Sequence, residues 1–190
     1  MSATVSFRQM KDGTAADYRL IDQLYRQYVR SLPDRITEAL GKLKGSSFGY
    51  QIDRYTHSLQ TATRALRAGA DEEMVTAALV HDIGDELAPY NHASLAASVL
   101  RPYVRPEVTW IVEQHGLFQT YYYVHHMGGD RNQRDRLRGH PWFDACAAFC
   151  EEWDQPSFDP DYDNEPLATF EPIVRRIFTR TAHDPLNVRV

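Results

Sequence analysis

The sequence has little cysteine and no long apolar run. Its only two cysteines, Cys146 and Cys150, lie four positions apart in a chain of 190 residues. Such a pair is typical of a reduced cytoplasmic protein rather than of a disulfide framework. No apolar stretch approaches the roughly 20 residues that span a bilayer, and the first residues lack the charged and apolar segments of a signal peptide. We therefore expect a cytoplasmic protein without a membrane partner.

The sequence also lacks a concentrated charge of one sign. Its net charge of −5 is spread along the chain, so the basic patch or stripe that binds nucleic acid is not expected. Hydrophobic residues make up 43% and charged residues 25%, an ordinary globular composition. A chain of 190 residues suits one domain with one core. None of these features points to nucleic acid as a partner.

Paired strand patterns are absent, and helical periodicity dominates. The expected helices cover about 15–29, 33–44, 53–67, 71–84, 91–102, 106–122, 141–153 and 167–179. The polar segment 121–139 is expected to form a mobile loop, with or without a short helix, and the segment 156–166 to be irregular. We predict an all-α fold, in which a single helical domain at 49–190 follows an N-terminal helical extension at 1–48.

Histidine is the unusual residue, because six of the eight histidines fall between positions 57 and 126. Four ionisable residues lie on apolar helical faces where leucine or valine is expected. These four are Asp82, His92, His115 and Asp154. His57 and His81 fit the helical spacing of the apolar residues less well. One core histidine is most simply a hydrogen-bonded imidazole, whereas six such residues are better explained by one shared cation cluster.

Imidazole and carboxylate donors suit iron, manganese or zinc, and the absence of a cysteine pair at ligand spacing argues against a structural zinc site. Neighbouring helical residues point about 100° apart. His81 and Asp82 can therefore share a metal only near a helix end, which Gly84 is expected to supply. A carboxylate at such an end can bridge two metals. Four histidines and two carboxylates suffice for two incompletely filled metals with open positions for chemistry.

This set of residues resembles the metal site of the HD-domain superfamily. The matching strings are Tyr55-Thr56-His57-Ser58-Leu59-Gln60, Ala78-Leu79-Val80-His81-Asp82-Ile83-Gly84, Asn91-His92, Glu113-Gln114-His115 and Trp153-Asp154. The resemblance covers about residues 50–180 and implies a helical bundle. It also implies that His57, His81, Asp82 and Asp154 hold one metal. Asp82, His92 and His115 would hold the second, with Asp82 as the bridging catalytic ligand.

Two branches of that superfamily share the set. In myo-inositol oxygenase and the phosphonate-cleaving HD oxygenases, a mixed-valent Fe(II)/Fe(III) pair uses O₂ to cleave a C–C or C–P bond. The HD phosphohydrolases use their metals, manganese among them, to activate water. The strings around His57 and His92 and the tail after Asp154 resemble the oxygenases. We therefore expect a di-iron oxygenase, with a phosphohydrolase as the alternative. A non-catalytic metal-binding module would instead lack a substrate-sized cavity.

The sequence departs from those relatives around the substrate. Asp85 stands where phosphohydrolases and myo-inositol oxygenases have lysine, and Tyr50 stands where the phosphonate-cleaving enzymes have glutamate. Gln119 and Glu151 replace their phosphonate-binding cations. We therefore expect these four residues to bind a neutral polyol or a cationic amino alcohol rather than a phosphonate. Arginines at 131, 134, 136 and 138 leave an anion site open, although a solvated face is the simpler interpretation.

Overall fold

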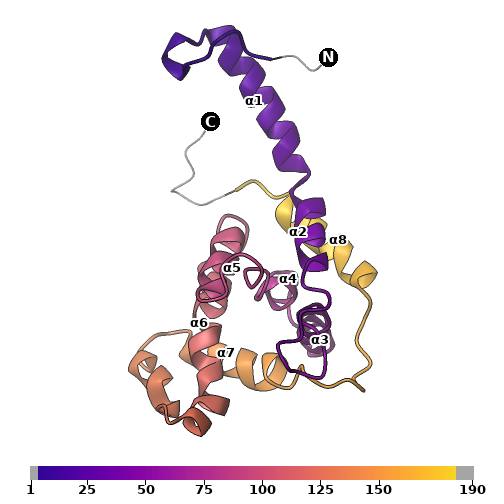
Figure 1. The fold of residues 1–190 in the computed structure, drawn as a ribbon, viewed down its shortest axis with the longest axis vertical. Coiled ribbons are helices and arrows are strands. Elements are labelled where there is room, and N and C mark those ends of the chain that lie inside the picture. The colour runs from indigo at the N-terminus through magenta and orange to yellow at the C-terminus, as the bar shows by residue number, and fades with distance from the viewer. Residues whose placement is uncertain (1–3, 183–190) are drawn as a thin grey trace.

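The computed structural model describes residues 4–182, and within this range the chain forms helices and no strand (Figure 1). The predicted all-α fold is therefore confirmed. The α-helices are α1 (Ala15–Arg30), α2 (Leu32–Gly41), α3 (Arg54–Arg67), α4 (Glu72–Val80), α5 (His92–Leu100), α6 (Pro106–Tyr123), α7 (Phe143–Ala148) and α8 (Leu167–Phe178). Three short 3₁₀ helices are η1 (Met10–Asp12), η2 (Val124–Met127) and η3 (Arg131–Leu137), and η4 (Phe149–Asp154) is a π-helix.

Helix α4 is the centre of the bundle. Every residue from Met74 to Val80 is buried, and α3, α6 and α8 pack around it. A helix that is apolar on all sides needs such a surround, because no face of it can be left in water. The residues that follow α4 therefore lie inside the molecule, which brings His81 and Asp82 into the core.

The two helices of the predicted extension differ from each other. Helix α2 packs on α8 and buries Ile36 and Leu40, whereas α1 projects away from the bundle (Figure 1). On α1, Leu24 is 43% exposed and Tyr28 is 59% exposed. The division after residue 48 stays a prediction. Residues 1–3 and 183–190 of the two predicted units lie outside the described residues.

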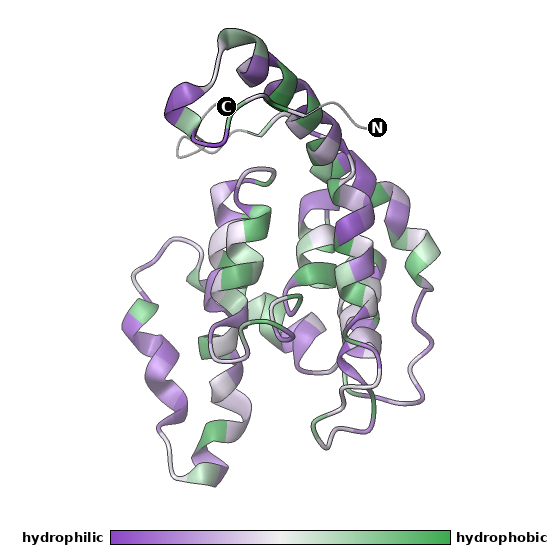
Figure 2. Ribbon diagram, turned by 45° about the horizontal axis from the view of Figure 1, so that its top comes forward, coloured by the Kyte–Doolittle hydropathy of each residue, from purple (hydrophilic) through white to green (hydrophobic). Residues whose placement is uncertain are grey.

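Two segments differ from the sequence predictions. Helix α4 ends at Val80 instead of near Gly84, and the segment expected at 141–153 is divided into α7 and the π-helix η4. The segment 121–139 contains η2 and η3, and Figure 2 shows η3 to be composed mainly of hydrophilic residues. Over residues 4–182, no helix is both long enough and apolar enough to cross a membrane.

The contrast between α1 and α2 predicts unequal effects of the same substitution. Leu40→Ala in α2 removes a side chain that is 1% exposed and should lower the free energy of unfolding by about 3 kcal/mol through the cavity it leaves. Leu24→Ala in α1 should change it by less than about 0.5 kcal/mol. Urea unfolding followed by circular dichroism measures both, and equal losses would show that α1 is packed in solution.

Candidate metal centre

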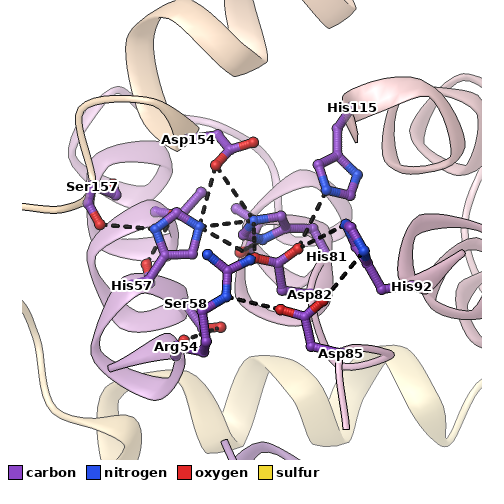
Figure 3. Close-up of polar contacts among 12 residues, drawn as sticks. Arg54, His57, Ser58, His81, Asp82, Asp85, His92, His115, Asp154 and Ser157 are labelled. Carbon is purple, nitrogen blue, oxygen red and sulfur yellow. Dashed lines mark hydrogen bonds and ion pairs between the residues drawn. The ribbon is translucent and has the colours of Figure 1, made fainter. Parts of the chain in front are cut away.

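The six predicted ligands come together at the centre of the bundle, although they derive from five separate places in the chain (Figure 3). His57 lies on α3, His81 and Asp82 follow α4, His92 begins α5, His115 lies on α6, and Asp154 ends η4. Five of the six residues are at most 2% exposed. The exception is His92, whose side chain is 24% exposed. The stripe predicted for α5 is only partly buried, because Ala96 lies in the core and Val99 packs against it, whereas His92 itself is half-buried. His92 lies at the rim of the centre.

Local structure explains how two adjacent residues reach one centre. After Val80 the regular helix gives way to successive turns, with the amide of Ile83 donating to the carbonyl of Val80 and that of Asp85 to Asp82, each at 3.0 Å. The helix end that the sequence analysis assigned to Gly84 therefore comes earlier, at His81. Because these turns leave the helical path, the His81 and Asp82 side chains can both point into the same space.

Gly84 fixes the other side of the centre. A Cβ atom at this position would lie 2.6 Å from the carbonyl oxygen and 2.8 Å from the Cα of His92. Real Cβ atoms do not approach other atoms so closely, so only glycine lets the two segments meet here. The position of His92 thus requires glycine, which has no side chain, at position 84.

The π-helix η4 places the last carboxylate. The amide of Gln155 donates to the carbonyl of Cys150 at 2.9 Å, five residues back, which widens the helix at this point. π-turns of this kind often occur at functional sites. Cys150 lies in the core, where its thiol donates to the carbonyl of His115 at 3.6 Å. Asp154 is thereby carried on a segment that packs directly on α6.

Each of the four histidines has its Nδ1 beside a backbone carbonyl oxygen. The partners of His57, His81, His92 and His115 are Ser157, Ala78, Pro89 and Val112, at 2.8, 2.8, 3.3 and 2.6 Å. A carbonyl oxygen can only accept, so each Nδ1 must carry the hydrogen. In a neutral ring, Nε2 is then a free acceptor. This orientation is the usual second-shell arrangement of metal-binding histidines.

All four Nε2 atoms point toward Asp82, and they divide between its two oxygens. Oδ2 faces His57 at 3.4 Å and His81 at 3.3 Å. Oδ1 faces His92 at 3.4 Å and His115 at 3.3 Å. Asp82 therefore lies between two groups of histidine nitrogens, as a bridging carboxylate would.

Asp154 joins the first of these groups. Its Oδ1 lies 3.2 Å from Nε2 of His57 and 3.5 Å from Nε2 of His81. The group of candidate ligands on the Oδ2 side of Asp82 thus has three members, His57, His81 and Asp154. The group on the Oδ1 side has two, His92 and His115.

Acceptor atoms face one another throughout this cluster. The Nε2 atoms of His57 and His81 are 3.1 Å apart. Oδ1 of Asp82 and Oδ2 of Asp154 are buried without a hydrogen-bond partner. Lone pairs at such distances repel in a dry interior unless a cation lies between them. The donor types suit a divalent transition metal, so the residues fit two metal ions.

Protonation is the only other source of positive charge at these nitrogens. Burial lowers the pKa of His81, but Asp82 and Asp154 outweigh it and raise that pKa well above its usual value. Burial likewise opposes the charge on Asp82, yet His81 and Arg54 hold the pKa of its carboxyl well below the usual range. The electrostatic environment of the cluster therefore favours positive charge on the histidine side and negative charge on the carboxylates.

Three groups of residues could each hold a metal ion, because within each group the ligand atoms lie within 4.8 Å of one another. The groups are His57–His81–Asp154, His81–Asp82–His115 and Asp82–Asp85–His92. Asp85, predicted as a substrate-binding residue, thus lies among the candidate ligands. Its Oδ1 is 3.2 Å from Nδ1 of His92.

Arg54 belongs to this cluster, although its sequence position did not predict such a role. Its side chain, only 13% exposed, forms an ion pair with Oδ2 of Asp82, and its Nε donates to Oδ2 of Asp85 at 2.8 Å (Figure 3). The available signal was its position three residues before His57, on the same face of α3. Because Arg54 neutralises Asp85, the view of Asp85 as a free anion that repels phosphate is not supported by this geometry.

A cavity of about 540 Å³ opens beside the centre, a volume in the range of small-molecule sites. His92 and His115 line it, whereas His57 and His81 do not. Both histidines beside Oδ1 of Asp82 therefore face the cavity, and Asp154 is the member of the other group that also lines it.

Three of the four predicted substrate-binding residues line this cavity: Tyr50, Asp85 and Gln119. Glu151 does not; it is exposed, and Gln155, one turn later, lies on the lining instead. Tyr50 stacks on Phe158 at a centroid distance of 4.4 Å, and Phe158 stacks on His57 at 4.3 Å. One wall is thus aromatic and contacts a candidate ligand directly.

The arginines of the segment 121–139 lie apart from this cavity. Arg131 and Arg134 stack on the Tyr121 ring at 4.1 and 3.8 Å, and neither is on the lining. Arg54 is therefore the arginine among the residues that line the cavity.

Comparison with protein families identifies an HD domain at residues 54–144. The matched segment contains four of the predicted histidine ligands and Asp82, and it ends before Asp154. A comparison with curated proteins found no match. Residues 54–144 therefore match an HD domain, and the buried histidine and aspartate cluster could bind metal, which fits a metal-dependent HD enzyme.

The contact at Gly84 predicts a selective loss of metal. Gly84→Ala should push the first turn of α5 away, lower the free energy of unfolding by about 1–3 kcal/mol, and reduce the Mn²⁺ bound per chain from two ions to one. Gly41→Ala is the matched control, because nothing lies within 4 Å of its added Cβ. Metal analysis after dialysis measures the stoichiometry; two retained ions in Gly84→Ala would contradict the role given to His92.

Proposed function

We propose that this protein is a dinuclear non-haem iron oxygenase that uses O₂ to oxidise or cleave a small hydroxylated compound. The observation that carries the dinuclear part is the division of four Nε2 atoms between the two oxygens of Asp82. The oxygenase part draws on the sequence resemblance around His57, His92 and the segment after Asp154.

The proposed ligand sets follow the geometry. His57, His81, Asp82 and Asp154 would hold the first metal, and Asp82, His92 and His115 would hold the second. The second set has fewer protein ligands and both of its histidines line the cavity, so a substrate hydroxyl would bind on that side. Iron bound in this way supplies the capacity to take up O₂ and to transfer single electrons.

The cavity residues orient the substrate. Tyr50 and Phe158 provide an aromatic wall, and Gln119 offers both a donor and an acceptor to a hydroxyl group. Burial, helped by the nearby Cys150 and Glu151, raises the pKa of Tyr122 to about 12. Its phenol therefore stays protonated near neutral pH and can donate a hydrogen bond to the substrate. Such a lining suits a polyol or an amino alcohol.

The proposed chemistry balances without a further reductant. A vicinal diol and O₂ would yield a carboxylic acid, an aldehyde and water. The substrate supplies all four electrons that O₂ takes up, one oxygen atom enters the acid, and the other leaves as water. The small molecule and O₂ are therefore the only partners that this reaction requires.

A metal-dependent phosphohydrolase is the second candidate, and Arg54 is the observation that favours it. A guanidinium on the cavity lining matches the geometry of phosphate oxygens. In that reaction water attacks phosphorus, the alcohol leaves, and no electrons are transferred. Manganese or another divalent metal would serve.

Removal of a candidate metal ligand that faces the cavity should abolish the oxygenase activity. Protein purified without oxygen and loaded with iron should consume O₂ with a polyol or amino alcohol, and its half-oxidised form should give a coupled mixed-valent paramagnetic resonance signal. His92→Ala should lose both the signal and at least about 100-fold in turnover. His126→Ala, an exposed histidine outside the cluster, should retain both.

The opposite pattern would select the alternative. Hydrolysis of phosphoesters with Mn²⁺, abolished in His81→Ala, together with no coupled signal and no O₂ uptake, would replace the oxygenase by a phosphohydrolase. Two bound metals with neither activity would indicate a binding module.

A further inference from the structure

Arg54 occupies the place of a cation within the candidate metal centre. Its Nη2 pairs with Oδ2 of Asp82, the oxygen that also faces Nε2 of His57 and His81. The guanidinium therefore approaches the first metal position from the cavity side. Arg54 is 13% exposed and Asp82 is 1% exposed, so water screens their interaction weakly.

A second acid holds the guanidinium in this place. Nε of Arg54 donates to Oδ2 of Asp85 at 2.8 Å, and Asp85 is 11% exposed. Arg54 thus bridges two carboxylates through two different nitrogens. If the bond to Asp82 breaks, the bond to Asp85 can remain, and the side chain needs no new partner.

Oδ2 of Asp82 contacts Arg54 and also faces the position where His57 and His81 would hold a metal ion. A carboxylate oxygen can accept a hydrogen bond and bind a metal at the same time, but a guanidinium this close to the metal position would repel the ion. Coulomb repulsion between like charges is strong where water is excluded. Metal binding must therefore displace Nη2 from Asp82.

We propose that Arg54 is a resident counter-cation that competes with metal for Asp82, moves onto Asp85 alone when metal binds, and thereby sets the metal affinity of the centre. This inference rests on the metal centre proposed above. Arg54 is a positioning residue in this role, since it acts on the metal through Asp82. In the metal-free protein it neutralises a carboxylate that would otherwise be buried without sufficient compensation.

Metal affinity tests the competition directly. Mn²⁺ titration calorimetry on the full chain should show that Arg54→Gln binds the ion about tenfold more tightly or better than the wild type, because a competing charge has been removed. Arg54→Lys keeps the charge and should stay close to the wild type. Arg67→Gln is the matched control: it removes one positive charge from the same helix at an exposed pair with Glu165 and should leave the affinity unchanged.

Thermal unfolding provides a second readout. Without metal, the midpoint of Arg54→Gln should fall by roughly 5–10 °C relative to the wild type, since a buried charge pair is broken. With saturating Mn²⁺ the difference should shrink, because Asp82 then has the metal as its partner. A crystal structure of the loaded wild type should show Nη2 away from Asp82 and Nε still on Asp85.

The outcomes are distinct. Equal or weaker Mn²⁺ binding by Arg54→Gln would overturn the proposal and make Arg54 a support of the ligands instead of a competitor. Lysine and glutamine variants that bind equally tightly would overturn it as well, because charge would then not be the cause. No Mn²⁺ binding by the wild type would overturn the metal centre itself. Normal binding of two ions without O₂ chemistry would leave this inference standing while the oxygenase proposal fails.

Discussion

The structure depends on one electrostatic constraint, which is that buried acceptor atoms face one another at the centre of the bundle. Four carbonyl oxygens take the Nδ1 hydrogens of the histidines, and so every Nε2 is left as an acceptor. These nitrogens meet Asp82 and Asp154, which are acceptors too. Such a cluster is stable only with added positive charge, from protons, from Arg54 or from metal. Folding and cation binding are therefore coupled in this protein.

The fold meets this constraint by ending or interrupting its helices at the centre. Helix α4 stops at Val80, α5 begins at His92, and η4 widens before Asp154. Each irregularity aims a side chain that a continuous helix would direct elsewhere. Gly84 makes two of these irregular segments compatible by allowing them to touch. The regular parts of α4 and α6 supply the rigid surround that keeps the donor atoms in place.

The candidate metal ligands could be predicted from the sequence, but several of their positions and partners could not. His115 could be predicted because its helix places it on an apolar face, and Asp82 because the apolar stripe of α4 leads up to it, although that helix ends at Val80. His92 could be predicted from the stripe that it shares with the buried Ala96, but not its half-buried position at the start of α5. Arg54 was not predicted, because its position three residues before His57 is a weak signal and an arginine after the helix cap Asp53 has several local interpretations. Its partners Asp82 and Asp85 come from a distant segment and are fixed only by tertiary packing. Glu151 was chosen because it stands in the place of a phosphonate-binding cation of the relatives, and in this structure it is exposed while Gln155 lines the cavity.

The pair of Arg54 and Asp85 changes the argument about the substrate. A lysine at position 85, as in the enzymes that the sequence resembles, would add a free cation to the cavity. Here the acid at 85 and the arginine at 54 cancel, and the arginine is further committed to Asp82. The cavity is therefore about two charges more negative than it would be with lysine at that position. A more negative surround favours metal binding and offers less attraction to a dianion. This balance supports the proposed substrate of low charge, although Asp85 is paired with Arg54 and is not a free anion.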